Sequence, residues 1–142
     1  MLIWGNAFRI APFPRNRCEE ARASIAAARV RVLTIGFAPG QPYMGELPKN
    51  WNIPRQTGLT AQVPRGALVV AIRQLIIFSG PTPTGWRHIG QTGFHCFRPE
   101  ADEPFPLTIG DEVTFRRVSP DELDALAVED PLGGGAEVED LA

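Results

Sequence analysis

The chain has 142 residues, a formal net charge of −2 and a hydrophobic fraction of 44%, which suffices for one domain with its own core. Its 14 prolines and 14 glycines are too many for a helical bundle and favour a mainly β fold with many turns. No apolar run approaches the roughly twenty residues of a membrane-spanning helix, and the N-terminus lacks the apolar region of a signal peptide. We therefore expect a soluble, cytoplasmic protein without a membrane partner, in which Cys18 and Cys96 remain free thiols.

Charged residues are unevenly distributed along the chain. Ten basic and three acidic residues occur up to Arg73, whereas four basic and thirteen acidic residues follow it. The basic residues form no runs, and no nucleic-acid-binding motif accompanies them. We expect a solvated acidic tail and no nucleic-acid partner.

The first 37 residues predict an arm, a helix and a strand. Residues 1–16 show no hydrophobic period and read as an arm or loop, and Asn16 is a suitable N-cap. Small and apolar residues then recur at helical spacing and predict a helix over about 17–28. These residues are Cys18, Ala21, Ile25 and Ala28. Alternating branched residues over 30–37 predict a strand that runs into a Pro-Gly loop.

The middle of the chain predicts short strands joined by proline-rich loops. Residues 39–60 form a structured excursion, because their apolar side chains need burial: Tyr43, Met44, Leu47, Trp51 and Ile53. Residues 63–66 read as a turn, and 67–78 as two buried strands or one long bent strand. A turn-rich loop over 79–85 precedes two short strands within 86–97, around Gln91-Thr92-Gly93.

The last third predicts one strand and one helix. Residues 109–115 read as a turn followed by a strand in which Val113 and Phe115 face the core. Ser119, with a proline after it and Glu122 three residues on, predicts a capped helix that ends near Val128. Three glycines at 133–135 and the acidic end should be mobile. The result is a closed or nearly closed barrel of short strands with two small helices.

A set of motifs in fixed order resembles one known family. They begin with Gly-Phe-Ala-Pro-Gly-x-Pro-Tyr-x-Gly-x-Leu over 36–47 and continue with Pro54-Arg55, Val63-Pro64-x-Gly66, Gln74, Gly85-Trp86, Ile89-Gly90-x-Thr92, Phe97-x-Pro99 and Gly110-Asp111-x-Val113-x-Phe115. This pattern resembles the allophanate hydrolase subunit 1 family, also called the carboxyltransferase C/D subdomain. The family includes the B subunit of bacterial ATP-dependent 5-oxoprolinase and the sporulation kinase inhibitor KipI. The resemblance covers about residues 19–118.

The resemblance implies a cyclophilin-like β-barrel from the Pro-Gly loop onward. It also implies that the helix and strand before that loop are the last pieces of a larger α+β N-terminal domain, so that the chain is a truncated or divergent member. We expect three units: the N-terminal remnant over 1–35, the barrel domain over 36–118, and the C-terminal helix with a flexible acidic tail over 119–142.

The chain departs from the family pattern at several positions. Gln41 stands where the family has phenylalanine before Pro-Tyr, and Thr84 replaces a glycine of Pro-Gly-Gly-Trp. The family loop Ala-Gly-x-Gln-Thr-Gly-Ile reads Ala-Ile-Arg-Gln-Leu-Ile-Ile over 71–77. The last change turns a flexible polar loop into an apolar strand, which favours a non-catalytic role.

Five residues in or near these motifs are candidate contacts to a substrate or partner: Tyr43, Arg55, Gln74, Trp86 and His88. Tyr43 either plugs the barrel mouth or lines a groove, and Trp86 suits a lid or an interface anchor. Arg55 could hold a carboxylate with two hydrogen bonds, or it is an ordinary surface arginine. The amide of Gln74 either satisfies a backbone group or binds a ligand.

No catalytic set is apparent. His88 and His95 lack a third metal ligand at suitable spacing, so no metal site is expected. Cys96 directly follows His95 and would point to the opposite face of a strand, which excludes a Cys–His nucleophile pair. The catalytic residues therefore stay unassigned.

Two functions follow from the resemblance. In the first, the chain acts with a subunit 2-like partner, which is the C subunit in 5-oxoprolinase or a KipA-like protein, in hydrolysis of a cyclic amide or urea derivative. It would bind no cofactor alone, ATP would act in the complex, and the chain would be inactive by itself. The alternative is a non-catalytic, KipI-like module that inhibits a histidine kinase. Prolyl isomerisation would rest on barrel shape alone.

Overall fold

The computed structural model describes residues 2–4 and 15–140, with side chains described from residue 19 to residue 140. The elements in chain order are β1 (Leu2–Trp4), α1 (Arg15–Ala27), β2 (Val30–Ile35), β3 (Pro42–Gly45), η1 (Lys49–Trp51), β4 (Thr60–Val63), β5 (Ala67–Ala71), β6 (Gln74–Ile77), β7 (Thr82–Thr84), β8 (Arg87–Gln91), β9 (Glu112–Arg116) and α2 (Pro120–Glu129). Within the described part of the chain, neither helix has the length and apolar character that crossing a membrane requires.

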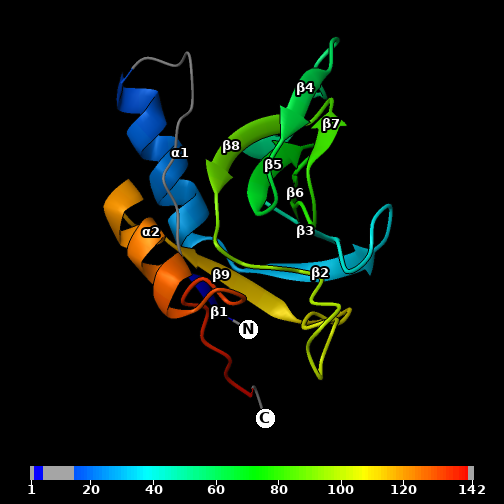
Figure 1. Ribbon diagram of the computed structural model, residues 1–142. Coiled ribbons are helices and arrows are strands. Elements are labelled where there is room, and N and C mark those ends of the chain that lie inside the picture. The colour runs from blue at the N-terminus through cyan, green and yellow to red at the C-terminus, as the bar shows by residue number, and fades with distance from the viewer. Residues whose placement is uncertain (1, 5–14, 141–142) are drawn as a thin grey trace.

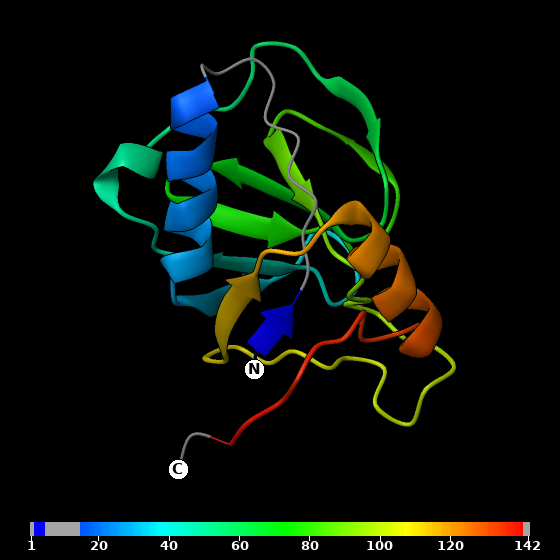
Figure 2. The same ribbon diagram turned by 90° about the vertical axis from the view of Figure 1, so that its left-hand side faces the viewer.

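The protein is mainly β, with one large curled sheet and two helices. The large sheet has the strand order β1-β9-β2-β3-β6-β5-β8, and β4 pairs with β7 in a separate two-stranded sheet. Figure 1 shows the large sheet curling into a half-barrel, with β2 and β9 below β5, β6 and β8. Both helices lie on the same side of the sheet and face the viewer in Figure 2. This architecture agrees broadly with the expected cyclophilin-like barrel.

Strand β2 belongs to the same sheet as strands that come much later in the chain. It pairs with β3 through Val32 and Met44 and with β9 through Val30 and Val113. The segment before the Pro-Gly loop and the strands after it therefore share one hydrogen-bonded sheet. The parallel pair of β1 and β9 extends this sheet by one strand.

Several local predictions are confirmed. Helix α1, β2 and β9 lie where the sequence predicts them, although α1 begins two residues early and contains Asn16 instead of being capped by it. Val113 and Phe115 are buried. The Ser119 hydroxyl accepts a hydrogen bond from the backbone N–H of Glu122 at 3.1 Å, which caps α2 as expected.

The segment 67–78 forms two strands, one of the two arrangements that its sequence allows. β5 and β6 pair antiparallel from Leu68 opposite Ile77 to Ala71 opposite Gln74. The turn between them places Ile72 at a φ of 50° and Arg73 at a φ of 60°. Two successive positive φ values are typical of a type I′ hairpin turn, which normally takes Asn-Gly. Ile72 occupies the position where the family pattern has glycine.

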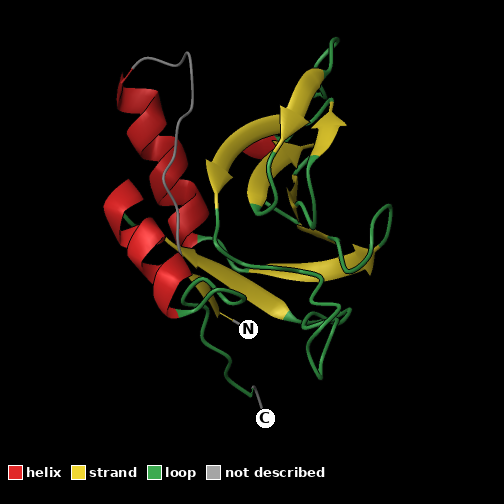
Figure 3. Ribbon diagram, in the orientation of Figure 1, coloured by secondary structure: helices red, strands yellow, loops and turns green. Residues whose placement is uncertain are grey.

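Several predictions of secondary structure are wrong. Residues 2–4 form a strand and not part of an arm; the remainder of that arm, 5–14, lies outside the described residues. Two of the expected loops contain strands, β3 and β7, each with a proline at or near its start. Only one strand, β8, occurs in 86–97, and the rest of that segment is loop (Figure 3). Proline at the first position of a strand leaves the remaining ladder intact, which explains β3.

The glycine-rich segment after α2, predicted to be mobile, forms a packed turn. The carboxylate of Asp130 accepts hydrogen bonds from the backbone N–H groups of Gly133 at 3.0 Å and Gly135 at 3.2 Å. A Cβ atom on Gly134 would overlap the backbone of Gly93, so the two backbones meet without side chains. The segment therefore has tertiary contacts of its own.

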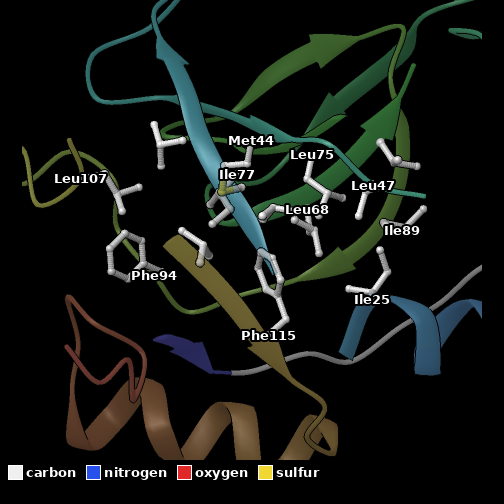
Figure 4. Close-up of a cluster of buried hydrophobic side chains, with 14 of the residues drawn as sticks. Ile25, Met44, Leu47, Leu68, Leu75, Ile77, Ile89, Phe94, Leu107 and Phe115 are labelled. Carbon is white, nitrogen blue, oxygen red and sulfur yellow. The ribbon is translucent and has the colours of Figure 1, made fainter. Parts of the chain in front are cut away.

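The main core lies between the curled sheet and α1. Figure 4 shows side chains from α1, β3, β5, β6 and β9 converging there, with Phe94 and Leu107 from the long loop. A second, smaller cluster lies on the other face of β5 and β6 and consists of Val63, Ala67, Val69, Ile76 and Phe78, with Tyr43 and Trp86 packed against it. Because side chains alternate along a strand, β5 and β6 are buried on both faces.

Candidate functional site

A pocket of about 220 Å³ opens beside the smaller cluster. Its inner wall is apolar and consists of Ile76 from β6 and Phe78 just after it. Three of the five candidate residues line it: Tyr43, Arg55 and Trp86. They come from three segments far apart in the sequence, so the fold gathers them at one place.

Tyr43 and Trp86 form the aromatic side of the pocket. Their ring centroids are 6.0 Å apart and the ring planes are at 79°, an edge-to-face contact. Tyr43 lies on β3 opposite Ile76 of β6, which fixes its direction. Trp86 follows β7, and its backbone N–H donates to the Thr84 hydroxyl at 3.0 Å.

Arg55 is held next to Trp86 by hydrogen bonds of its neighbours. The backbone N–H of Gln56 donates to the carbonyl of Gly85 at 2.7 Å, and the Gln56 side-chain amide donates to the carbonyl of Trp86 at 2.9 Å. Arg87 Nε donates to the carbonyl of Pro54 at 3.1 Å. The guanidinium of Arg55 itself is exposed and has no hydrogen bond or ion pair with the described residues.

Two buried polar residues also line the pocket, and the sequence did not single them out as site residues. Gln41 is 1% exposed, and its Oε1 accepts a hydrogen bond from the backbone N–H of Ser79 at 3.3 Å. Its Nε2 is buried without an acceptor among the described residues. Thr84 is 6% exposed, and its hydroxyl proton is free to be donated because the oxygen accepts from Trp86. Gln41 and Thr84 both depart from the family pattern, and this departure is the sequence signal that could have identified them as site residues.

The rim of the pocket is apolar and exposed. Phe37 is 81% exposed at a φ of 68°, and Leu59 is 74% exposed. Both line the pocket mouth, together with Pro83 and Gly85. An exposed aromatic in the left-handed region is unusual for a residue other than glycine, asparagine or aspartate. Adjacent exposed apolar side chains at a pocket mouth are typical of a surface that another molecule covers.

The other two candidate residues lie outside the pocket. Gln74 begins β6 opposite Ala71, with its Cγ beside Gly45. His88 lies on β8 opposite Val69, and its Nε2–H donates to the carbonyl of Gly90 at 2.9 Å. The structure does not bring either side chain to Tyr43, Arg55 and Trp86.

Cys96 is unsuited to nucleophilic chemistry. Burial raises the pKa of the Cys96 thiol to about 12, so the thiolate is absent near neutral pH. Burial and the charges of Arg65 and Arg98 lower the pKa of His95. Among residues 19–140, no cluster of His, Cys, Asp and Glu side chains is arranged to hold a metal ion.

Comparison with known families finds one match that covers most of the chain. Residues 9–107 match the family described as carboxyltransferase domain, subdomain C and D. Two curated proteins, each named as the B subunit of 5-oxoprolinase, are similar in sequence. The one from Bacillus subtilis (strain 168) is 38% identical over 88 residues, 62% of this chain and 37% of that protein. The one from Escherichia coli O157:H7 is 40% identical over 81 residues, 57% of this chain and 37% of that protein. The chain thus matches well under half the length of these relatives.

Solved structures share the fold. The crystal structure of TTHA0988 superposes with a TM-score of 0.73 at 27% identity and covers 83% of this chain and 26% of that one. The urea carboxylase of Kluyveromyces lactis superposes with a TM-score of 0.70 at 16% identity, over 94% of this chain and 15% of that one. At 16% identity, the second similarity extends to the fold alone. In both cases the chain corresponds to one part of a longer protein.

Proposed function

Because the chain belongs to the carboxyltransferase domain, subdomain C and D family, we propose that it is a subunit-type component of an enzyme that hydrolyses a cyclic amide. The relatives at 38% and 40% identity are each named as the B subunit of 5-oxoprolinase, and a protein of that kind works within a larger assembly. This sequence similarity is the observation that carries the proposal.

The proposed reaction opens a lactam ring. Water adds across the ring amide: the carbonyl carbon–nitrogen bond breaks, the carbon takes the hydroxyl and the nitrogen takes the proton. 5-Oxoproline would give glutamate, and hydrolysis of ATP in the complex to ADP and phosphate would drive the step. The chain would contribute the pocket walls at Tyr43, Arg55 and Trp86. The nucleophile activation and the ATP site would belong to other subunits, which agrees with the inert thiol of Cys96.

The proposed partner is a subunit 2-like protein, the counterpart of the C subunit in 5-oxoprolinase, seated over the pocket mouth. The exposed side chains of Phe37 and Leu59 support this placement, because covering them would remove apolar surface from water. Each apolar side chain of this size contributes roughly 1.5–3 kcal/mol when it becomes fully buried. Contact at this place would also close the pocket against solvent.

Reconstitution tests the proposal directly. The full chain is copurified with a subunit 2-like partner and the subunits that accompany it, and release of glutamate from 5-oxoproline is measured with and without ATP. We expect turnover that requires this chain, the partner and ATP together. Phe37→Asp should abolish copurification, whereas Val128→Asp, an equally exposed site (80%) on α2, should leave it intact. A stable complex that releases no glutamate would overturn the proposed reaction.

A second candidate function is a non-catalytic module that binds and inhibits a histidine kinase. The β5–β6 hairpin supports it, because apolar strand residues there replace the polar loop of the family pattern. The apolar pocket mouth would then serve as the docking surface. Inhibition of kinase autophosphorylation by the full chain, in the absence of any subunit 2-like protein, would favour this function over the first.

A further inference from the structure

We propose that the pocket recognises a small ligand carrying both a carboxylate and a neutral carbonyl, through Arg55 and Gln41 respectively. This inference rests on the proposed function and deepens it, because it assigns the two polar ends of the substrate to two residues. Arg55 would bind the carboxylate and so select an anionic ligand. Gln41 would donate a hydrogen bond to the carbonyl and so select a ligand with a second acceptor.

The buried amide of Gln41 is the first observation. Its Nε2 has no acceptor within residues 19–140, and the residue is 1% exposed, so bulk water does not supply one either. A buried donor without an acceptor costs roughly 1–3 kcal/mol, which a ligand carbonyl would recover. The amide is oriented by one hydrogen bond, which Oε1 accepts from the N–H of Ser79. That single bond of 3.3 Å is weak enough to let the amide adjust toward a ligand.

The unpaired guanidinium of Arg55 is the second observation. It lines the same pocket and has no acidic partner among residues 19–140. Most other arginines near the sheet are paired, such as Arg29 with Glu112 at 2.7 Å and Arg73 with Glu46 at 3.4 Å. A planar guanidinium suits a carboxylate because it can donate two parallel hydrogen bonds.

The apolar walls and the volume limit the ligand further. A cavity of 220 Å³ holds about seven water molecules at roughly 30 Å³ each, which is below the ~300–1,000 Å³ typical of drug-sized sites. The ligand is therefore of small-metabolite size. Tyr43, Trp86 and Phe78 present apolar surface to its middle. A small ring that bears one carboxylate and one carbonyl satisfies the limits set by Arg55, Gln41 and the apolar walls.

The chain's own departures from the family pattern point to the same pocket. Gln41 and Thr84 replace phenylalanine and glycine of that pattern, and both line the cavity. Each replacement adds hydrogen-bonding capacity to the apolar interior. The polar character of the pocket is thus a property of this chain, and we assign Gln41 as its specificity-determining residue.

Calorimetry with three probes tests the assignment on the full chain. The probes are 5-oxoproline, which has both groups, 2-pyrrolidinone, which lacks the carboxylate, and proline, which lacks the carbonyl. We expect 5-oxoproline to bind most tightly. Arg55→Gln should weaken 5-oxoproline about tenfold and leave 2-pyrrolidinone unchanged. Lys49→Gln, at an exposed site outside the pocket, is the matched control and should change neither affinity.

Gln41→Leu gives the second test. It should weaken 5-oxoproline about tenfold and leave proline unchanged, because only the carbonyl contact is lost. A lower thermal midpoint of unfolding with unchanged 5-oxoproline affinity would show that Gln41 is only structural and would overturn its role. Failure of the unmodified chain to bind any of the three probes would overturn the whole inference.

The outcomes separate this inference from the proposed function. Selective binding by the chain, lost in the two variants, with no glutamate released by the complex would support the pocket and overturn the reaction. Turnover of 5-oxoproline by complexes containing Gln41→Leu or Arg55→Gln, at unchanged kcat and KM, would support the reaction and overturn the pocket assignment.

Discussion

The two faces of the β5–β6 hairpin contribute differently to the molecule. One face adds the side chains of Leu68, Val70, Leu75 and Ile77 to the main core. The other face adds Val69, Ile76 and Phe78 to a smaller cluster whose edge is the pocket. Alternate residues of the same two strands therefore serve stability and binding. A register shift of one residue would exchange the two sets.

The largest effect should come from the main-core face. Leu68 is fully buried, and Leu68→Ala should lower the free energy of unfolding by about 2–5 kcal/mol through lost burial and a cavity. Urea denaturation measures the loss. Leu59→Ala, at a leucine that is 74% exposed on the pocket rim, is the control and should stay within about 0.5 kcal/mol. Equal losses of unfolding free energy in Leu68→Ala and Leu59→Ala would contradict the assignment of stability to the main-core face.

The next effect concerns alkaline pH and the same core. Unfolding frees the Cys96 thiol to ionise near its ordinary pKa of 9.0, whereas the folded chain holds it protonated up to about 12. Unfolding therefore releases a proton above pH 9, and stability should fall toward pH 12 by up to about 1.4 kcal/mol per pH unit. Urea unfolding of the original chain and of Cys96→Ala at about pH 8 and about pH 10.5 isolates this contribution. An identical pH dependence in both proteins would refute it.

A smaller loss should follow a change on the pocket face. Trp86 is half-buried, and Trp86→Ala removes one edge-to-face contact with Tyr43. We expect a loss of about 1–2 kcal/mol, below the ~3–5 kcal/mol of a fully buried aromatic. Urea denaturation of Trp86→Ala and Leu68→Ala under the same conditions compares their losses of unfolding free energy. A loss as large as that of Leu68→Ala would mean that both faces carry stability equally.

The smallest effect should be a gain, at the turn that joins the two strands. Ile72 has a φ of 50° and is 51% exposed, so its side chain contributes little while its backbone is disfavoured. Asparagine adopts this conformation readily, and Ile72→Asn should raise the free energy of unfolding by about 1 kcal/mol. Ile109→Asn, at an isoleucine that is 66% exposed with ordinary φ, should give no gain. A loss on Ile72→Asn would show that the isoleucine makes a contact that outweighs the turn.

The sequence predicts an element correctly where neighbouring residues alone determine its structure. The helical spacing of α1, the capped start of α2 and the alternation in β9 each follow from neighbours within one or two turns. The strands β3 and β7 were not predicted because Pro42 and Pro83 are typical of loops. Their backbone partners lie on β2, β6 and β4, and such distant pairing leaves no periodic signal in a short segment.

The site could be predicted only in part for a similar reason. Tyr43, Arg55 and Trp86 lie in segments of unusual composition. The hydrogen bonds of Gln56 bring Arg55 beside Trp86, and an edge-to-face ring contact joins Trp86 to Tyr43. Gln41 stands out in the sequence only as a departure from the family pattern, because its contact with Ser79, which is 38 residues away, leaves no local signal. Gln74 is a polar residue before an apolar run, which suggested a ligand contact, yet its position on the hairpin keeps it out of the pocket.

The backbone contact between Gly93 and Gly134 limits which residues these two positions can accept. A side chain at either glycine would displace the turn after α2, so neither position can vary unless the path of that turn varies too. The carbonyl of Leu132 accepts hydrogen bonds from the N–H of His95 at 2.9 Å and from Arg98 at 3.2 Å. Releasing the turn would break both bonds and admit water beside Phe94. The turn after α2 thus holds the segment of residues 93–98 in place against the core. Proteolysis or insertion of a tag near residue 134 should therefore disturb that segment, about 40 residues earlier in the chain.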